Sequence, residues 1–515
     1  MSRARVLAAP RWGEEDRWEV AHICFRDYLQ AITCMQEETS FTACILMSIC
    51  RAFRGLVLSL AIFAGNSCVP VGPDHETPAV ELPARFSDGE IRWKRETTES
   101  QPTPRAWWQL YGDSRLAALV ETAIANNQDL AAAAARVREA RELSRVARSR
   151  YFPAIDLGLR GDRTQSRFRG PVGGSSLENS FALPVDLSYE LDLWGKVYRE
   201  VEGARASEWA TVESLRALRL GISAEVAQTY WALRAVDADR ALLARAVELR
   251  RKSLELLTEQ REAGAISGLD LSRAETEVST AESERLGLDL DRVELVNALA
   301  VLTGAVATGT DIPEKTDIPR PPSVPTSLPS ELLRQRPDIR AAEYRVAAAN
   351  ANIGVAEAAF YPSFRIDAST GLDSATLAGL FNASAFVWSV GSSITVPITG
   401  QKLLRHQRNA AVAAHEAVSA EYRQTVLDAI REVENALQGT AILARRQQVQ
   451  ERALLSARKT YDLSFERFDA GQVSFLEVVD AERTRLESER VANAVRAERL
   501  AVSVALIKAL GGRWH

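Results

Sequence analysis

The chain has 515 residues, of which 46% are hydrophobic and 25% are charged, and its formal net charge at pH 7 is −5. These fractions are typical of a folded protein, and the small, interspersed charge argues against a basic nucleic-acid-binding surface. The sequence contains no HExxH, Walker, GxGxxG or GxSxG motif, and its five histidines are scattered. The usual signatures of a metalloprotease, a nucleotide-binding protein and a serine hydrolase are therefore absent.

Residues 47–67 (MSICRAFRGLVLSLAIFAGNS) resemble a bacterial lipoprotein signal peptide. Arg51 and Arg54 precede the apolar run 56–64, which is too short to span a bilayer. Small residues follow, and the pattern predicts that Cys68, the last cysteine of the chain, receives a covalent lipid after cleavage. The alternative is a short apolar helix in which Cys68 is inert.

Residues 1–46 do not suit the region in front of a signal peptide, because they are acidic and mixed in composition. A signal peptide is expected to begin its chain. We therefore expect Met47 to be the true start and residues 1–46 to be a non-native extension.

The rest of the chain contains an internal repeat. Residues 129–157 parallel residues 338–366, and residues 261–275 parallel residues 468–482. Self-similarity over this length predicts a duplicated structural unit. The predicted boundaries are an N-terminal segment 68–112, a first repeat 113–310, a Pro-rich linker 311–331 and a second repeat 332–515.

Six segments have the apolar spacing of three and four residues that indicates amphipathic helices, as at Val426, Ile430 and Val433. Two of them are very long and contain no internal proline. At 1.5 Å per residue the segment 197–262 would span roughly 100 Å, which indicates a coiled coil or a helical barrel. The expected helices are 129–150, 197–262, 268–303, 338–359, 402–469 and 475–510.

Four segments alternate between apolar and polar residues, as half-exposed strands do. Every odd position of FALPVDLSYELDL (181–193) is apolar, and FVWSVGSSITVPI (386–398) alternates in a similar way. Strands of this length suit a membrane-spanning sheet with its apolar face toward lipid, whereas a soluble sandwich with one solvated face is the alternative. The expected strands are 154–161, 181–193, 364–371 and 386–398.

The number of strands constrains assembly. Four strands cannot close a barrel, and open strand edges are not tolerated in lipid. A membrane-spanning sheet in this chain therefore requires more than one copy: a dimer would supply about eight strands and a trimer about twelve.

Several stretches resemble the TolC-like outer-membrane efflux family, in its lipoprotein branch. The resemblance covers nearly all of the chain from Cys68 to Trp514, although VPITGQK (396–402) departs from the family's usual turn. The stretches are CVPVGPDHETP (68–78), WWQLYGDSRLAALVETAIANNQDL (107–130), YELDLWGKV (189–197) and RQRPDIRAAEYRVAAANANIGVAEAAFYPSF (334–364).

The resemblance implies a mixed α and β membrane protein, in which two structural repeats supply four transmembrane β-strands and long α-helical hairpins. Three copies would form a 12-stranded β-barrel in the outer membrane and a periplasmic α-helical barrel. The implied partners are a periplasmic adaptor and an inner-membrane RND-type transporter, and the implied function is passive export of drugs or other small molecules. The resemblance implies no catalysis and no nucleotide binding, and the lipid on Cys68 is the only cofactor expected. The scattered histidines and the absence of a basic block predict no metal site and no nucleic-acid partner.

The turns AGAIS (263–267) and AGQVS (470–474) join the long helices in pairs. Their glycines suit backbone conformations that helices tolerate poorly. By resemblance these turns are periplasmic tips that contact the adaptor, while hairpin turn chemistry explains the same residues more plainly. The candidate contact residues are Gly264, Ser267, Gly471 and Ser474.

The stretch FLEVVDAER (475–483) is similar to the family's gate segment. Leu476, Asp480 and Arg483 fall on one helical face, at spacings of four and three. Three copies around an axis would form an apolar ring, a carboxylate ring and basic partners, which can close a pore and select ions. The alternative is a solvated pair between Asp480 and Arg483, worth on the order of a few tenths of a kcal/mol.

Two other functions are compatible with parts of this pattern. A periplasmic adaptor would also have long helical hairpins, but it would carry compact lipoyl-like or small barrel domains in place of the duplicated strands. A family member that serves protein or polysaccharide secretion, or metal export, would share the same architecture. The sequence does not identify the exported substrate.

Overall fold

The structure, a computed structural model, describes residues 70–80, 106–168, 174–264, 266–322 and 336–512. The chain divides into two units, of which the second, Val69–His515, contains all of the described residues. The predicted extension, the predicted signal peptide and Cys68 all lie outside the described residues. The following description concerns the second unit.

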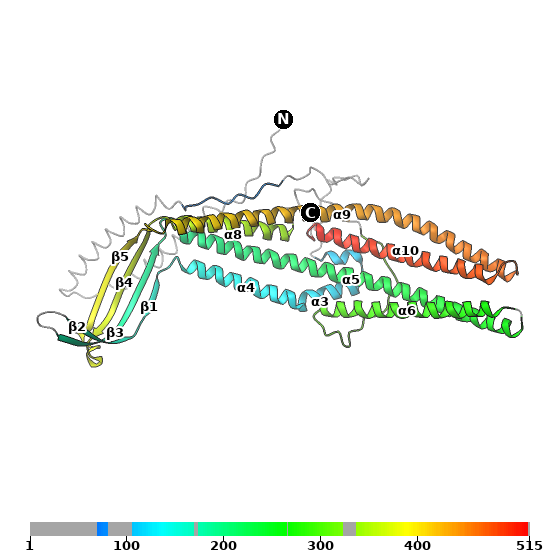
Figure 1. Cartoon of the computed structure of the whole chain (residues 1–515), viewed down its shortest axis with the longest axis horizontal. Helices are drawn as coiled ribbons and strands as arrows, with labels where there is room; N and C mark the ends of the chain where they lie inside the picture. The colour runs from blue at the N-terminus through cyan, green and yellow to red at the C-terminus, as the bar shows by residue number, and fades with distance from the viewer. Residues whose placement is uncertain (1–69, 81–105, 169–173, 265, 323–335, 513–515) are drawn as a thin grey trace, which may run out of the picture. The chain divides into compact units, whose positions relative to one another are not determined.

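Long helices dominate the described part of the chain (Figure 1). Both ends of all six predicted helices lie within one residue of the observed ends. The prediction missed α3, which begins where the Asp113 side chain accepts hydrogen bonds from the backbone N–H groups of Arg115 and Leu116 at 2.9 and 3.1 Å. The helices are α3 (Ser114–Asn126), α4 (Gln128–Ser149), α5 (Lys196–Glu262), α6 (Gly268–Leu302), α8 (Pro337–Ala358), α9 (Gln401–Asp469) and α10 (Phe475–Ala509), with short 3-10 helices η1 (Trp107–Tyr111), η2 (Leu377–Gly379) and η3 (Ala383–Ala385).

The long helices form two hairpins, α5 with α6 and α9 with α10. Helices α5 and α9 have 67 and 69 residues, whereas α6 and α10 have 35 each. At 1.5 Å per residue each long helix spans about 100 Å, so its shorter partner covers only the part next to the turn. Helices α4 and α8 pack along α5, and α8 also packs along α9. None of the helices in the described residues is long and apolar enough to cross a membrane.

The strands form one antiparallel sheet in which β3 pairs with β4 and so joins the two halves of the chain. Strand β5 pairs with β4, and both β1 and β2 pair with β3 in one continuous register. The hydrogen bonds between β3 and its partners β1 and β2 are interrupted at Pro184, which has no N–H to donate. The N–H of Gly158 still donates to the carbonyl oxygen of Pro184 at 2.9 Å. The predicted strand 154–161 is therefore two strands, and β3 begins well before residue 181. The strands are β1 (Ala154–Leu157), β2 (Arg160–Phe168), β3 (Gly174–Leu191), β4 (Ser363–Ser374) and β5 (Phe386–Thr395).

The sheet has an apolar face and a polar face. On the apolar face Leu157 is 72% exposed and Trp388 is 71% exposed. On the polar face Asp186 accepts hydrogen bonds from Arg160 at 3.2 Å and from Ser369 at 2.6 Å. An apolar face left open by every described element does not fit the core of a soluble sandwich, and it indicates contact with lipid or with a partner. By register the apolar face contains Ile155, Leu157, Phe181, Val185, Leu187, Phe364, Trp388, Val390 and Ile394.

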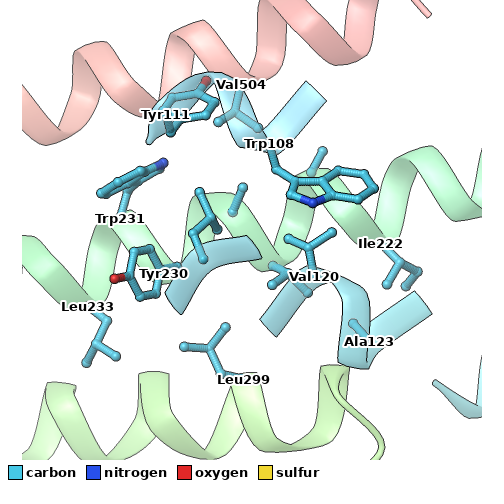
Figure 2. Close-up of a cluster of buried hydrophobic side chains, with 14 of the residues drawn as sticks. Trp108, Tyr111, Val120, Ala123, Ile222, Tyr230, Trp231, Leu233, Leu299 and Val504 are labelled. Atoms are coloured by element: carbon cyan, nitrogen blue, oxygen red, sulfur yellow. The ribbon is translucent and has the colours of Figure 1, made fainter. Parts of the chain in front are cut away.

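A large apolar core lies where η1 and α3 meet α5, α6 and α10 (Figure 2). Trp108 and Tyr111 of the WWQLY stretch belong to it together with Tyr230 and Trp231 of α5. The rings of Tyr111 and Trp231 lie 5.6 Å apart between centroids, and the Tyr111 hydroxyl shares a hydrogen bond of 2.7 Å with Ser503 of α10. This core therefore fixes the last helix of the second half to the first half.

The segment 70–74 occupies a socket beside the start of α5. The guanidinium of Arg199, which is 2% exposed, donates to the carbonyl oxygens of Val71 and Gly72, each at 3.2 Å. It also donates to the carboxylate of Asp74 at 3.1 Å. A buried charge that is satisfied by backbone carbonyls depends on the continued presence of that backbone. The segment is therefore an integral part of the helical domain.

We expect Gly354→Ala to lower the midpoint of thermal unfolding. A Cβ at this position would lie 2.8 Å from Cγ of Arg199 and 2.9 Å from the carbonyl oxygen of Val71. Overpacking of this kind costs about 1–3 kcal/mol. Far-ultraviolet circular dichroism of the purified protein measures the change.

Gly221→Ala in α5 is the matched control, because no neighbouring atom lies within 4 Å of its Cβ position. Alanine favours a helix over glycine by about 0.5–1 kcal/mol, so this variant should melt at or above the wild-type midpoint. Equal midpoints for the two variants would show that the socket is not tightly packed.

Candidate functional site

The two hairpin turns have the backbone conformation that their glycines predict. Gly264 has a φ of 73° and Gly471 a φ of 70°, in the left-handed region that glycine adopts without strain. Their N–H groups donate to the carbonyl oxygens of Arg261 and Phe468 at 3.0 and 2.8 Å. Each turn thereby satisfies a carbonyl group at the end of a long helix.

The helices that leave these turns begin after Ser267 and Ser474, and both serines are exposed. The Ser267 hydroxyl donates to the Asp270 carboxylate at 2.7 Å and accepts from the Asp270 N–H at 3.3 Å. Ser474 makes no side-chain capping bond, and the rings of Phe468 and Phe475 pack across its turn with centroids 5.6 Å apart. The two turns therefore have similar backbones and different side-chain chemistry.

The three predicted gate residues Leu476, Asp480 and Arg483 lie on an exposed face of α10. Within the described residues no ion pair joins Asp480 to Arg483. Arg483 instead reaches Glu277 of α6, with Nε to Oε2 at 3.1 Å. The exposed face is thus tied to the other hairpin through its arginine.

A second ion pair of the same kind lies seven residues further along both helices. Nη1 of Arg490 is 3.1 Å from Oε2 of Glu284. A seven-residue step keeps the same face of a helix, so the two pairs lie along one line of contact. We call this contact the charged seam, and it consists of Arg250, Glu277, Glu284, Glu482, Arg483 and Arg490.

The inner part of the charged seam is centred on Arg250 of α5, whose side chain is 12% exposed. Its Nε and Nη2 donate to Oε2 of Glu482 at 3.1 and 3.0 Å, and its Nη1 lies 3.3 Å from Oε2 of Glu277. Because Glu277 also pairs with Arg483, one series of alternating charges links α5, α6 and α10. Pairs that are partly buried are screened less by salt than exposed pairs are.

A cavity of about 50 Å³ adjoins the charged seam between the two hairpins. Apolar side chains such as Leu249, Phe465 and Val478 line it, and Oε1 of Glu482 is buried without a hydrogen-bond partner in the described chain. The void and the unsatisfied oxygen show that the packing between the hairpins is incomplete at this point. No described region brings together three or more His, Cys, Asp or Glu side chains that could hold a metal ion.

The charged seam was not predicted from the sequence. Glu277 and Glu284 are seven residues apart, as are Arg483 and Arg490, and this matched spacing of opposite charges was a usable signal. Local patterns alone do not reveal which helices face each other, because the paired residues are 206 positions apart along the chain.

A model of the outer membrane efflux protein family matches residues 119–305 and 328–512. The chain is 31% identical over 465 residues to the toluene efflux pump outer membrane protein TtgF of Pseudomonas putida, covering 89% of this chain and 96% of TtgF. It is 30% identical over 463 residues to the pyoverdine export outer membrane protein OpmQ of Pseudomonas aeruginosa, covering 87% and 96%. The solved structure of the outer-membrane channel OprN matches with a TM-score of 0.78 at 28% identity, covering 86% of this chain and 99% of OprN.

We expect Arg490→Glu to loosen the contact between the hairpins, because it would place two carboxylates where Arg490 and Glu284 now lie 3.1 Å apart. The double variant Glu284→Arg/Arg490→Glu restores opposite charges and should restore the contact. Backbone hydrogen exchange in α6 and α10 measures the effect: it should be faster in the single variant and close to wild type in the double variant.

Arg431→Glu is the matched control, since Arg431 pairs at 3.0 Å with Asp428 of its own helix, α9. Its exchange in α6 and α10 should equal that of the wild type. Failure of the double variant to recover slow exchange would contradict a direct pairing of Arg490 with Glu284.

Proposed function

Because this chain belongs to the outer membrane efflux protein family, we infer that it is the outer-membrane channel of a tripartite efflux system. It is a component of the outer membrane of a Gram-negative bacterium and provides the exit duct for an efflux pump. Its partners are a periplasmic adaptor and an inner-membrane transporter, for which we propose the RND type. The observation that carries this inference is the duplication: the family model matches both halves, and each half supplies strands to one sheet and a long helical hairpin.

We propose that the inner-membrane pump, rather than this chain, selects the substrate. The relatives TtgF and OpmQ are named for the export of two different compounds, toluene and pyoverdine. This chain is similarly related to both of them. A passive duct needs no binding site for its cargo, and drugs and other small molecules are the class that we propose for this one.

We propose that three copies of the chain assemble around one axis. Strand β5 and the β1–β2 pair are the two edges of the sheet, and in the described chain each is paired on one side only. Such edges are not tolerated in lipid. Pairing β5 of one copy with β1 and β2 of the next satisfies both edges, and three copies then close a barrel of about twelve strands, with β1 and β2 counted as one interrupted strand.

Exposed apolar stripes on the helices support the same assembly. Leu286, Leu290 and Val293 of α6 follow one another at spacings of four and three, and each is more than half exposed. This spacing is typical of a helix that packs along another helix. Ile442 and Val449 form a similar stripe on α9. We propose that the α6 stripe of one copy packs against the α9 stripe of the next.

We expect Leu290→Glu to prevent this assembly, because it places a charge in the middle of the α6 stripe. Native mass spectrometry in detergent should find three chains for the wild type and a single chain for the variant. Val306→Glu is the control, since Val306 is 77% exposed but lies in the loop after α6. A wild-type dimer would refute the trimer, and trimeric Leu290→Glu would refute the role of the stripe.

We propose that Leu476, Asp480 and Arg483 face the axis and close the channel at its periplasmic end. Their shared exposed face supports this placement. Because Arg483 is engaged by Glu277, three Asp480 carboxylates would contribute negative charge without a local partner, which favours the passage of cations. The ion pairs of the charged seam connect α10 to α5 and α6 of the other hairpin.

Asp480→Ala should raise single-channel conductance and lower cation preference, because it removes a ring of charged side chains from the narrowest part of the duct. Recordings in planar bilayers measure both quantities. Asp462→Ala, an exposed carboxylate of α9 near the same turns, should behave like the wild type. Unchanged conductance in correctly assembled Asp480→Ala would count against the gate.

We propose that Gly264, Ser267, Gly471 and Ser474 contact the periplasmic adaptor. All four are exposed, and they lie at the ends of α5 and α9 that are remote from the sheet. Cross-linking of Ser474→Cys to the adaptor in cells tests this contact.

We also propose that Cys68 carries a covalent lipid, on the basis of the signal-like segment 47–67. The lipid would anchor a channel that already spans the membrane, so its loss should leave export intact. Incorporation of labelled palmitate into the wild type but not into Cys68→Ser, with efflux retained, is the expected result.

A further inference from the structure

The β2–β3 hairpin extends past the rest of the sheet. The last pair between β3 and β4 is Phe181 with Ser374, whereas β2 and β3 continue to pair as far as residues 168 and 174. The aromatic part of the apolar face ends at the same level, where the Phe181 ring lies against Gly161, 3.5 Å from its Cβ position. The hairpin beyond this level is a two-stranded extension on the side of the sheet away from the long helices.

Acidic and basic residues separate onto opposite faces of this extension. Side chains alternate along a strand, so Arg163 and Arg167 continue the apolar face of the sheet. Asp162 and Glu178 fall on the polar face, together with Arg160, which pairs with Asp186. The remaining described residues that continue the apolar face here are uncharged, namely Gln165, Ser175, Leu177 and Asn179.

The two arginines lack acidic partners, unlike basic residues at the other end of the sheet. Within the described residues neither Arg163 nor Arg167 forms an ion pair, and both are exposed. Near the helices, in contrast, basic residues have acidic partners. The ion pairs are Arg150 with Glu200, Lys196 with Glu190, and Arg365 with Asp367. Unpaired positive charge therefore lies beyond the apolar face at the end that would face the cell exterior.

The positions suit the headgroup layer of a membrane. At about 3.3 Å per residue, Arg163 lies roughly 7 Å beyond the Gly161–Phe181 pair and Arg167 roughly 20 Å beyond it. Arginine side chains next to an apolar band extend toward headgroups, and a guanidinium binds phosphate through two parallel hydrogen bonds. The headgroups of the outer leaflet of a Gram-negative outer membrane belong to lipopolysaccharide, which carries phosphates on lipid A and on its core sugars.

We propose that Arg163 and Arg167 bind phosphate groups of outer-leaflet lipopolysaccharide. Arg163 is placed for lipid A at the edge of the apolar face, and Arg167 for the core sugars above it. This contact rests on the proposed placement of the sheet in the outer membrane, and it adds a specific lipid partner to the proposed channel.

The test is binding of purified, assembled protein to lipopolysaccharide with a short core. We expect Arg163→Gln/Arg167→Gln to bind about tenfold more weakly than the wild type, because two charge-assisted contacts are lost. Arg160→Gln is the matched control, since it lies on the same strand but on the opposite face, and it should keep wild-type affinity. Enzymatically dephosphorylated lipopolysaccharide should bind the wild type as weakly as intact lipopolysaccharide binds the double variant.

Wild-type affinity in the double variant, or an equal loss in Arg160→Gln, would overturn the proposal. Displacement of lipopolysaccharide by an equal concentration of inorganic phosphate would assign the two arginines to a free anion instead. Conductance is recorded from the same preparations. A double variant that conducts normally but binds lipopolysaccharide weakly supports the lipid contact. A wild type that binds lipopolysaccharide but does not conduct would overturn the proposed channel function and would leave the proposed lipid contact unaffected.

Discussion

The antiparallel pairing of β3 with β4 is the constraint on which the rest of the structure depends. It joins one strand from each half, from Phe181 opposite Ser374 to Leu191 opposite Phe364. A register slip of one residue would turn Val185 and its neighbours to the polar face. The same pairing brings the starts of α5 and α9 to one end of the sheet. It also pairs the edge of β3 in the first half with the edge of β4 in the second half. In the described residues the outer edges, β5 on one side and β1 with β2 on the other, remain unpaired on their outer sides.

The ends of the helices were predicted closely from the sequence. Long runs without proline indicate a helix, and glycine or proline residues indicate where it begins or ends, as at Gly264 and Pro337. It missed α3, where a short helix depends on the Asp113 cap more than on periodicity. It also missed the outer part of β3, because the apolar alternation that identified the strand ends at Phe181 while the backbone pairing continues. The predicted gate residues share an exposed face, but the partner of Arg483 lies on another hairpin, and such distant pairings have no local signature.

Arginine side chains occur in three environments in this fold, which differ in burial and in the partners that are present. Arg199 is buried against backbone, and loss of a partner from a buried charge costs about 3–5 kcal/mol. Arg490 pairs with Glu284 at a partly exposed site, where such pairs contribute about 0–1 kcal/mol. Arg163 has no ion-pair partner in the described chain. Loss of a partner of Arg199 is therefore expected to destabilise the protein more than loss of the exposed pair between Arg490 and Glu284.

The charged seam also has a consequence for symmetry. Helices α6 and α10 have equal lengths, and Thr276 and Ser283 occupy the positions in α6 that correspond to Arg483 and Arg490 in α10. Two identical halves would have the same residue at both positions and therefore the same contact at every joint, so divergence of the halves explains why these ion pairs occur at one kind of joint only. In a ring of three chains the seam would form within each chain, while the equivalent contact between chains would place Thr484 opposite Thr276. In such a ring, joints with ion pairs within each chain would alternate with uncharged joints between chains, which would make the symmetry threefold and not sixfold.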